Sequence, residues 1–335
     1  MIAYILRRLL YALPILVGVN VITFALFFVV NSPDDMARMH LGVKRVTPEA
    51  IQKWKEERGY DKPLLFDAQA KCVKTVLGLP TCQERLEQTI FFDKSVKLFA
   101  FQFGRADDGR DIAYEIANRM GPSLAIALPV FLAGLAAYIS FALIMAFFRA
   151  TYIDFTGVVL CVAMMSISGL FYIIGGQYLI SKLWNLVPIS GYAEGVAGIK
   201  FLVLPVLVGV VAGVGASTRW YRTIFLEEMG RDYVRTARAK GMSELRVLFR
   251  HVLANAMIPI LTGAVVVIPL LFMGSLITES FFGIPGLGSY TIDAINSQDF
   301  AVVRSMVFLG SVLYIVGLIF TDISYTLVDP RIRLE

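Results

Sequence analysis

Residues 9–30, LLYALPILVGVNVITFALFFVV, form an uninterrupted run of 22 residues without a charged side chain. An α-helix rises about 1.5 Å per residue, so this run reaches about 33 Å and can cross the hydrocarbon core of a bilayer. A cleaved signal peptide would have an apolar core of only about 7–15 residues and a small-x-small cleavage site. This run is longer and is followed by Asn31-Ser32-Pro33-Asp34. The pattern therefore predicts an uncleaved first transmembrane helix.

Five further uncharged runs give the chain the composition of a membrane protein. Of its 335 residues, 57% are hydrophobic and 17% are charged, and the mean hydropathy is +0.69, which does not suit a water-exposed surface. Lipid offers no partner for open backbone amides, and an outer-membrane barrel would show short alternating strands instead. The sequence therefore predicts an all-α polytopic membrane protein with six transmembrane helices. The further runs cover residues 120–148, 155–181, 201–218, 252–278 and 305–321.

The distribution of basic residues predicts the orientation of the chain. Lys and Arg are enriched in short cytoplasmic segments of membrane proteins. With Arg7 and Arg8 in the cytoplasm, the basic segments 149–154, 219–251 and 329–335 fall on the same side. We therefore expect both termini to be cytoplasmic. The expected divisions are 1–30 (N-terminus and first helix), 31–119 (a small extracytoplasmic domain), 120–328 (a five-helix core with a cytoplasmic loop at 219–257) and 329–335 (a tail).

The outer segment 31–119 has features of a small domain. Pro48–Arg58 is predicted to be a helix. Cys72 and Cys82 lie in this segment, and an oxidising compartment would favour a local disulfide over two free thiols. Cys161, in the middle of the third run, is expected to be a reduced, small apolar filler.

The sequence lacks the residues that several classes of function require. No G-x-x-x-x-G-K-[ST] phosphate-binding motif occurs. His40 and His251 are expected on opposite sides of the membrane, so we expect no metal site and no His-based catalysis. Basic residues do not alternate with base-stacking aromatics, which argues against nucleic-acid binding. An ion-coupled carrier would place charges near mid-membrane, whereas Glu279 and Asp322 fall near helix ends, where simple polar contacts near the headgroups are expected.

The polar segment 219–257 separates the fourth and fifth runs. Residues 231–240 are compatible with a helix, Gly241 suits a left-handed turn, and Ser243 can cap a second helix. Apolar residues recur at helical spacing on one face of that second helix: Leu245, Leu248 and Val252. Composition alone would also fit a solvated basic loop. The order of the residues predicts two short helices hinged at one glycine.

This segment resembles the EAA loop of ABC importer permeases, in the form found in the dipeptide, oligopeptide and nickel permease family. That form runs Y-[VI]-R-T-A-R-A-K-G and continues with R-H and N-A-[ML]-x-P. The chain has Tyr233-Val234-Arg235-Thr236-Ala237-Arg238-Ala239-Lys240-Gly241, then Arg250-His251 and Asn255-Ala256-Met257-Ile258-Pro259. The general EAA consensus has Glu and Ala where Arg235 and Thr236 stand, a departure that the peptide branch shares.

Other motifs extend the resemblance over nearly the whole chain. The start at Tyr4–Leu9, the element Gly59–Pro63 and the end at Asp329–Arg333 are similar to family motifs. Residues 279–288, ESFFGIPGLG, resemble the outer loop E-x-x-F-x-x-P-G-L-G. This loop would line an outer gate or meet the binding protein, or it would only turn the chain. Its candidate residues are Glu279, Phe282, Pro285, Gly286 and Gly288. Two departures, Asn31–Asp35 in place of P-G-D-P and a longer stretch from about 67 to 100, concern the outer domain and the substrate.

The resemblance implies the type I ABC importer permease fold in the bacterial cytoplasmic (inner) membrane. It implies three kinds of partner: a second homologous permease, two nucleotide-binding ATPase subunits or domains, and an extracytoplasmic substrate-binding protein. ATP and Mg would be bound by the ATPases, so this chain would need no cofactor and would not be an enzyme. The residues expected to couple it to the ATPase are Arg235, Thr236, Ala237, Arg238, Ala239, Lys240, Gly241, Ser243 and Glu244. Among them, Ala237 and Ala239 would permit close approach of the ATPase.

The resemblance favours dipeptides or oligopeptides as the substrate. Nickel or a metal chelate is the alternative within the family, and no motif in the chain separates the two. A non-transporting membrane scaffold is the alternative from another class, and it would bind no ATPase. Polar residues within the runs are expected to make interhelical hydrogen bonds rather than to bind substrate: Asn20, Ser166, Ser168, Gln177 and Ser275.

Overall fold

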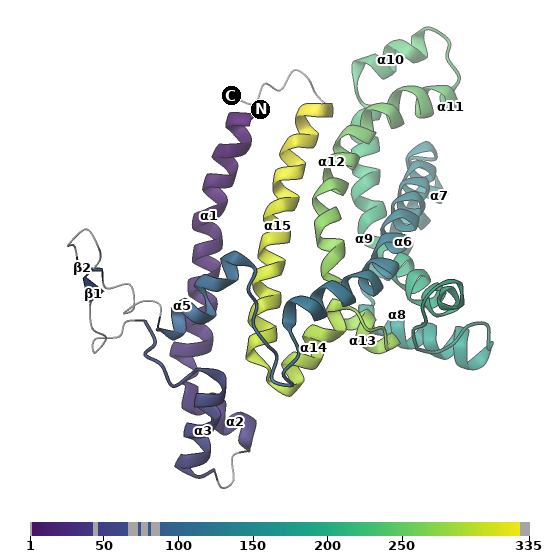
Figure 1. The fold of residues 1–335 in the computed structure, drawn as a ribbon. Helices are drawn as coiled ribbons and strands as arrows, with labels where there is room; N and C mark the ends of the chain where they lie inside the picture. Colours follow the sequence, from purple (N-terminus) through teal and green to yellow (C-terminus); the bar gives the residue numbers. More distant parts are fainter. Residues whose placement is uncertain (1, 43–45, 66–72, 75–79, 82–87, 329–335) are drawn as a thin grey trace. The chain divides into compact units, whose positions relative to one another are not determined.

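A computed structural model describes residues 2–42, 46–65, 73–74, 80–81 and 88–328 (Figure 1). These residues are nearly all helical, as predicted, and one short antiparallel ladder joins β1 (Val73–Lys74) to β2 (Pro80–Thr81). Cys72 and Cys82 lie outside the described residues, so their disulfide stays a prediction. The chain forms two compact units, which we call the first unit (1–118 and 291–315) and the second unit (119–290 and 316–335).

The membrane-spanning helices agree with the uncharged runs of the sequence. In the described part of the chain, five helical stretches are long and apolar enough to cross a membrane, and one bent pair makes a sixth candidate. The prediction of a helical, polytopic membrane protein is therefore confirmed. The five stretches are Leu10–Val30, Ile112–Phe147, Val196–Met229, Glu244–Met273 and Phe300–Ser324.

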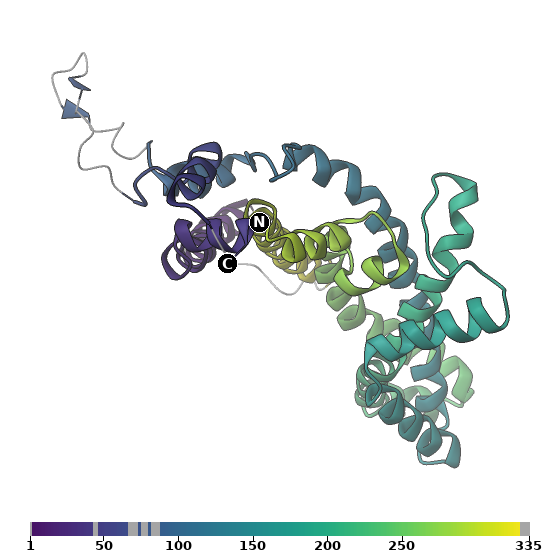
Figure 2. The ribbon, with the colours of Figure 1, turned by 90° about the horizontal axis from the view of Figure 1, so that it is seen from below.

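The third predicted span is the bent pair. α7 (Tyr152–Met165) meets α8 (Gly169–Gly176) and η3 (Gln177–Leu183) at 91°, and the ribbon turns sharply there (Figure 1 and Figure 2). At the break the Ser166 hydroxyl donates to the Val162 carbonyl oxygen at 2.9 Å, and the Ser166 N–H donates to the same oxygen at 3.1 Å. No proline marks this break in the sequence.

The first unit is built around the amino-terminal helix. α1 (Ile2–Phe24) continues into η1 (Ala25–Val30), and α2 (Pro33–Leu41), α3 (Pro48–Arg58), α5 (Ile90–Lys94) and η2 (Val96–Ala100) follow. The predicted helix at 48–58 is confirmed, and it ends at Gly59 with a left-handed φ of +66°. The buried core of these elements consists of Phe24, Phe28, Met36, Ala37, Ile51, Trp54, Tyr60 and Ile90.

The second unit holds most of the remaining helices. One core joins α6, α8, α9 and α13 through Ile126, Ile173, Leu204, Val208, Phe282 and Ile284. Cys161 on α7 is buried and free, as predicted. The second unit contains η4 (Val196–Gly198), α9 (Ile199–Met229), α12 (Ala254–Leu270), η6 (Leu271–Met273) and α13 (Leu276–Phe282). Three helices have residues in both units: α6 (Ile112–Phe147), α14 (Leu287–Ser297) and α15 (Phe300–Val328).

Candidate functional site

The connection between α9 and α12 folds into a helical hairpin. α10 (Asp232–Ala239) is followed by a turn at Gly241, whose φ of +75° is the left-handed conformation that favours glycine. α11 (Glu244–Val247) then runs into the π-helical η5 (Leu248–Leu253) and on into α12. The predicted pair of helices and the predicted turn are confirmed. Ser243 occupies the predicted N-cap position, but its side chain makes no capping hydrogen bond.

One face of the hairpin is buried in the core of the second unit. Val234 and Ala237 on α10 are buried, as are Val247 and Leu248 after the turn. They share one apolar cluster with residues of α6, α9 and α12. Because protein interiors are close-packed, a displacement of the hairpin must be passed on to these three helices. The other buried members of the cluster are Ala142, Leu143, Ala146, Tyr221, Phe225, Met229, Val252, Ala256 and Ile260.

The buried face differs from the predicted one at two positions. Leu245, which was predicted to share a face with Leu248 and Val252, is 57% exposed. Val247 is buried in its place, because α11 is a single turn and the π-helical turn after it has a wider repeat than an α-helix. Ala237, which was expected to permit close approach of an ATPase, has its side chain in this chain's own core. Its small size therefore serves packing against the chain's own helices.

The opposite face of the hairpin is polar and open. Arg238 makes a forked ion pair with Glu244 across the turn, with Nε at 2.9 Å from Oε1 and Nη2 at 3.0 Å from Oε2. Arg238 thus closes the turn within the chain. The other predicted coupling residues of the hairpin are exposed: Arg235, Thr236, Ala239, Lys240, Gly241, Ser243 and Glu244.

A partly buried ion pair joins α7 to α9, and sequence reasoning missed it. Nε and Nη2 of Arg222 each lie 2.7 Å from a carboxylate oxygen of Asp154. Asp154 also accepts a hydrogen bond from the Ala150 N–H at 3.1 Å, and Ala150 has a φ of +62°. One carboxylate therefore holds the α6–α7 turn and α9 together. The partners are 68 residues apart, so only their opposite charges at neighbouring helix ends could have suggested the pair.

Tyr233, at the start of α10, is held by a second polar contact. Its hydroxyl donates a hydrogen bond to the Glu228 carboxylate. Burial, together with this bond and the nearby negative charge, raises the pKa of Tyr233 to about 12. The phenol therefore stays protonated at neutral pH and keeps its role as a donor.

At the other end of α12 the chain forms the loop that was predicted as an outer gate. α13 begins after the break at Gly274 and ends at Gly283, which has a left-handed φ of +64°. Glu279 has no exposed surface, so it does not make the simple helix-end contact near the headgroups that was expected. Of the other predicted gate residues, Phe282, Gly286 and Gly288 are buried and Pro285 is exposed.

The Glu279 carboxylate accepts hydrogen bonds from several segments of the second unit. The Ser275 N–H donates to Oε1 and the Ser289 N–H donates to Oε2, each at 3.1 Å. The Ser123 hydroxyl on α6 donates to the same carboxylate and accepts the Leu287 N–H at 2.8 Å. Burial raises the pKa of the Glu279 carboxyl, which lies beyond the end of the fifth span, and these hydrogen bonds oppose the rise.

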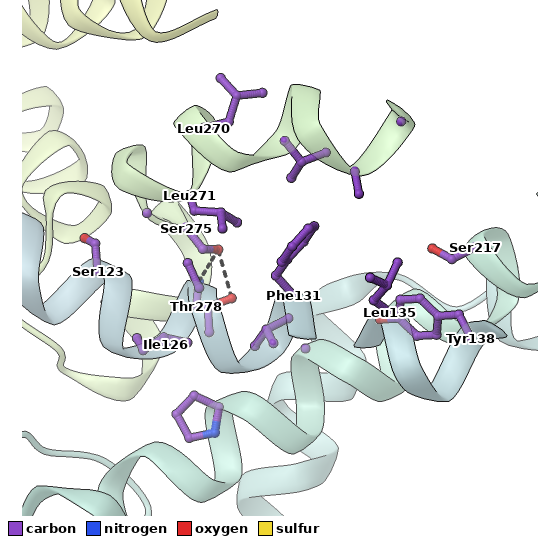
Figure 3. A pocket seen from close by; sticks show the side chains of 18 of the residues that line it. Ser123, Ile126, Phe131, Leu135, Tyr138, Ser217, Leu270, Leu271, Ser275 and Thr278 are labelled. Atoms are coloured by element: carbon purple, nitrogen blue, oxygen red, sulfur yellow. Dashed lines mark hydrogen bonds between the residues drawn. The ribbon is translucent and has the colours of Figure 1, made fainter. Parts of the chain in front are cut away.

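A cavity of about 550 Å³ lies among α6, α9, α12 and α13. Figure 3 shows Phe131 standing between the ribbons of α6 and α12. Among the described residues that line the cavity there is no Lys or Arg. Its aromatic lining comes from Phe131, Tyr138, Trp220 and Tyr221, and its hydroxyl groups from Ser123, Ser217, Ser275, Thr278 and the two tyrosines. Glu279 is the one acidic residue in this described lining, and a cavity of this size can hold a small organic solute.

No candidate metal centre is found in the part of the chain that the structure describes. Within those ranges, no three or more His, Cys, Asp and Glu residues are grouped so that they could hold a metal ion.

These features define a polytopic membrane protein in which a hairpin is anchored to the helices around a cavity. The family of binding-protein-dependent transport system inner membrane components matches residues 123–334. The N-terminal region of such membrane components matches residues 1–82. The chain belongs to this family and is an inner membrane component of a binding-protein-dependent transport system.

Two peptide permeases are similar to the chain over its whole length, and a third is similar over part of it. A protein of Brucella abortus (strain 2308), described as a peptide transport system permease, is 31% identical over 342 residues, covering 100% of both chains. The dipeptide transport system permease protein DppB of Escherichia coli (strain K12) is 26% identical over 360 residues, covering 99% of both. The oligopeptide transport system permease protein AppB of Bacillus subtilis (strain 168) is 42% identical over 135 residues, or 40% of this chain and 43% of that one.

Proposed function

We propose that the chain is a permease subunit of an importer for dipeptides or oligopeptides, driven by ATP hydrolysis on separate subunits. The full-length similarity to permeases named for peptides and dipeptides supports this substrate class. The cavity supports it too, because aromatic and hydroxyl groups suit peptide side chains and backbone groups. A bare metal ion would instead favour several carboxylate, imidazole or thiolate ligands.

The observation that carries the proposal is the single core shared by the hairpin and the helices α6, α9 and α12. The exposed face of the hairpin docks on an ATPase subunit, and closure of the ATPase dimer displaces the hairpin. Because the shared core is close-packed, the displacement reaches helices that line the cavity. In this proposal ATP and Mg are bound by the ATPases.

The proposed assembly contains this chain, a second similar permease, two ATPase subunits or domains and an extracytoplasmic binding protein. The cargo path lies between the two permeases, because six helices are few for a closed aqueous path. Both termini and the hairpin face the cytoplasm, and residues 31–119 and 283–288 face outward. The positive-inside distribution of Lys and Arg supports this orientation.

Uptake into proteoliposomes tests the proposal. The complex would be reconstituted with its binding protein outside and ATP inside, and labelled dipeptide, labelled pentapeptide and nickel would be offered separately. We expect peptide uptake that requires both ATP and the binding protein, and no such uptake of nickel. Uptake of nickel alone would overturn the substrate class, and a chain that co-purifies with no ATPase would support the scaffold alternative.

A further inference from the structure

Glu279 occupies a cradle that excludes other side chains. Gly274 and Gly286 flank its carboxylate, and a Cβ atom added at either position would overlap a carboxylate oxygen. The side chain could make room only by moving away from the N–H groups of Ser275 and Ser289. The present position of the Glu279 carboxylate therefore requires glycine at both 274 and 286.

The cradle joins α6 to two segments on either side of the outer loop. Ser123 belongs to α6, Ser275 lies at the break before α13, and Leu287 and Ser289 lie at the start of α14. Ser123, Ser275 and Glu279 also line the 550 Å³ cavity. In Figure 3, Ser123 and Ser275 lie toward one end of the cavity, and Tyr138 and Ser217 lie toward the other. The Glu279 carboxylate accepts hydrogen bonds from Ser123 and from the Ser275 N–H, so it belongs to the end of the cavity where these two residues lie.

We propose that Glu279 is a positioning residue for transport, which holds the outer end of the cavity in the shape that responds to a loaded binding protein. Its two oxygens each accept a backbone N–H from a different segment, so α6, the break before α13 and the outer loop move as one piece. The proposal rests on the proposed function. It requires a carboxylate and not merely a side chain of this size.

Glu279→Gln is the discriminating variant. A glutamine has the same shape but only one acceptor oxygen, and its NH₂ group would face the N–H of Ser275 or of Ser289. A buried donor left without an acceptor weakens the cradle without removing packing volume. Glu57→Gln is the matched control, because it makes the same chemical change at an exposed position on α3.

The first readout separates positioning from folding. The quantity compared is the ratio of stimulated to basal ATP hydrolysis by the purified complex, measured for each variant. Stimulation by peptide-loaded binding protein should fall about tenfold or more, as expected when a charged group loses a buried hydrogen bond. Glu57→Gln should behave as wild type. Full stimulation in Glu279→Gln would overturn the proposal, and so would an equal fall of basal and stimulated rates, which indicates a folding role only.

The second readout does not depend on the cargo. Thr278→Cys places a thiol in the cavity wall, in a background with Cys72 and Cys82 changed to Ser and Cys161 changed to Ala. Labelling by a membrane-impermeant maleimide should be about tenfold faster when Glu279→Gln is added, because the cradle opens more often. An equal rate would overturn the proposal. If the wild-type complex were not stimulated by peptide, the proposed function would fail while this labelling still decided the role of Glu279.

Discussion

The α10–α11 hairpin and the Glu279 cradle flank α12, and each contains a glycine that the fold needs for a different reason. At Gly241 the backbone is left-handed with φ +75°, and an added Cβ would meet nothing within 4 Å. At Gly286 φ lies outside the left-handed region, and an added Cβ would overlap the Glu279 carboxylate. The hairpin is held by apolar packing, whereas the cradle is held by one buried carboxylate. The hairpin therefore depends on backbone conformation and buried apolar surface. The cradle depends on the space left by glycine and on the acceptor oxygens of Glu279.

The largest expected effect concerns the apolar attachment of the hairpin. Leu248→Ala removes a buried member of the shared core and should lower the free energy of unfolding by about 2–5 kcal/mol. Leu245→Ala is the control three residues away, on an exposed side chain, and should change it by about 0.5 kcal/mol or less. Thermal unfolding of the purified complex measures both. Equal losses would mean that Leu245 belongs to the core after all.

The next effect concerns space in the cradle. Gly286→Ala should destabilise the chain by about 3 kcal/mol, because the new methyl group displaces the carboxylate from its hydrogen bonds. Gly121→Ala on α6, where an added Cβ has open space, should be neutral or stabilising by up to about 1 kcal/mol. The same unfolding assay applies. If Gly286→Ala left the free energy of unfolding unchanged, the loop would be able to move aside, and glycine would not be required beside the Glu279 carboxylate.

A similar or smaller effect concerns backbone conformation at the hairpin turn. Gly241→Val should cost about 1–3 kcal/mol, because a β-branched residue is strained at positive φ. Gly241→Asn should cost less, because asparagine tolerates the left-handed region. Since the site has open space, both substitutions change conformation and not packing. Equal stability of the two variants would contradict the requirement for a left-handed turn.

The smallest effect concerns the ion pair across that turn. Arg238 and Glu244 are 33% and 57% exposed, so breaking the pair with Arg238→Gln should cost less than about 1 kcal/mol. Salt screens such a pair, so the difference from wild type should shrink between low and high ionic strength. A loss of several kcal/mol that salt does not reduce would place this pair among the main supports of the hairpin.

Sequence patterns predicted the features that depend on neighbouring residues. They did not predict the features that depend on contacts between residues far apart in the sequence. The uncharged runs, the helix Pro48–Arg58 and the turn at Gly241 follow from hydropathy, capping and glycine, and all three are confirmed. The bend between α7 and α8 was not predicted, because no proline marks the break at residues 166–168. The exposure of Leu245 was mispredicted because a π-helical turn alters the repeat.

The candidate site shows the same limit. The hairpin residues follow one another in the sequence, so their order alone located them. Glu279 was assigned to the loop correctly, but its burial depends on Ser123, which is 156 residues away, and on backbone N–H groups that carry no sequence signature. The Asp154–Arg222 pair was missed for the same reason.

The most direct test of the central claim is the ATPase activity of the reconstituted complex with Gly241→Val and Gly241→Asn. The claim is that the hairpin transmits motion between an ATPase subunit and the helices around the cavity. We predict that peptide-loaded binding protein stimulates hydrolysis in the wild type and in Gly241→Asn, and that Gly241→Val loses this stimulation while its ATPase subunits still co-purify. Undiminished stimulation in Gly241→Val would show that the hairpin does not couple the chain to ATP hydrolysis.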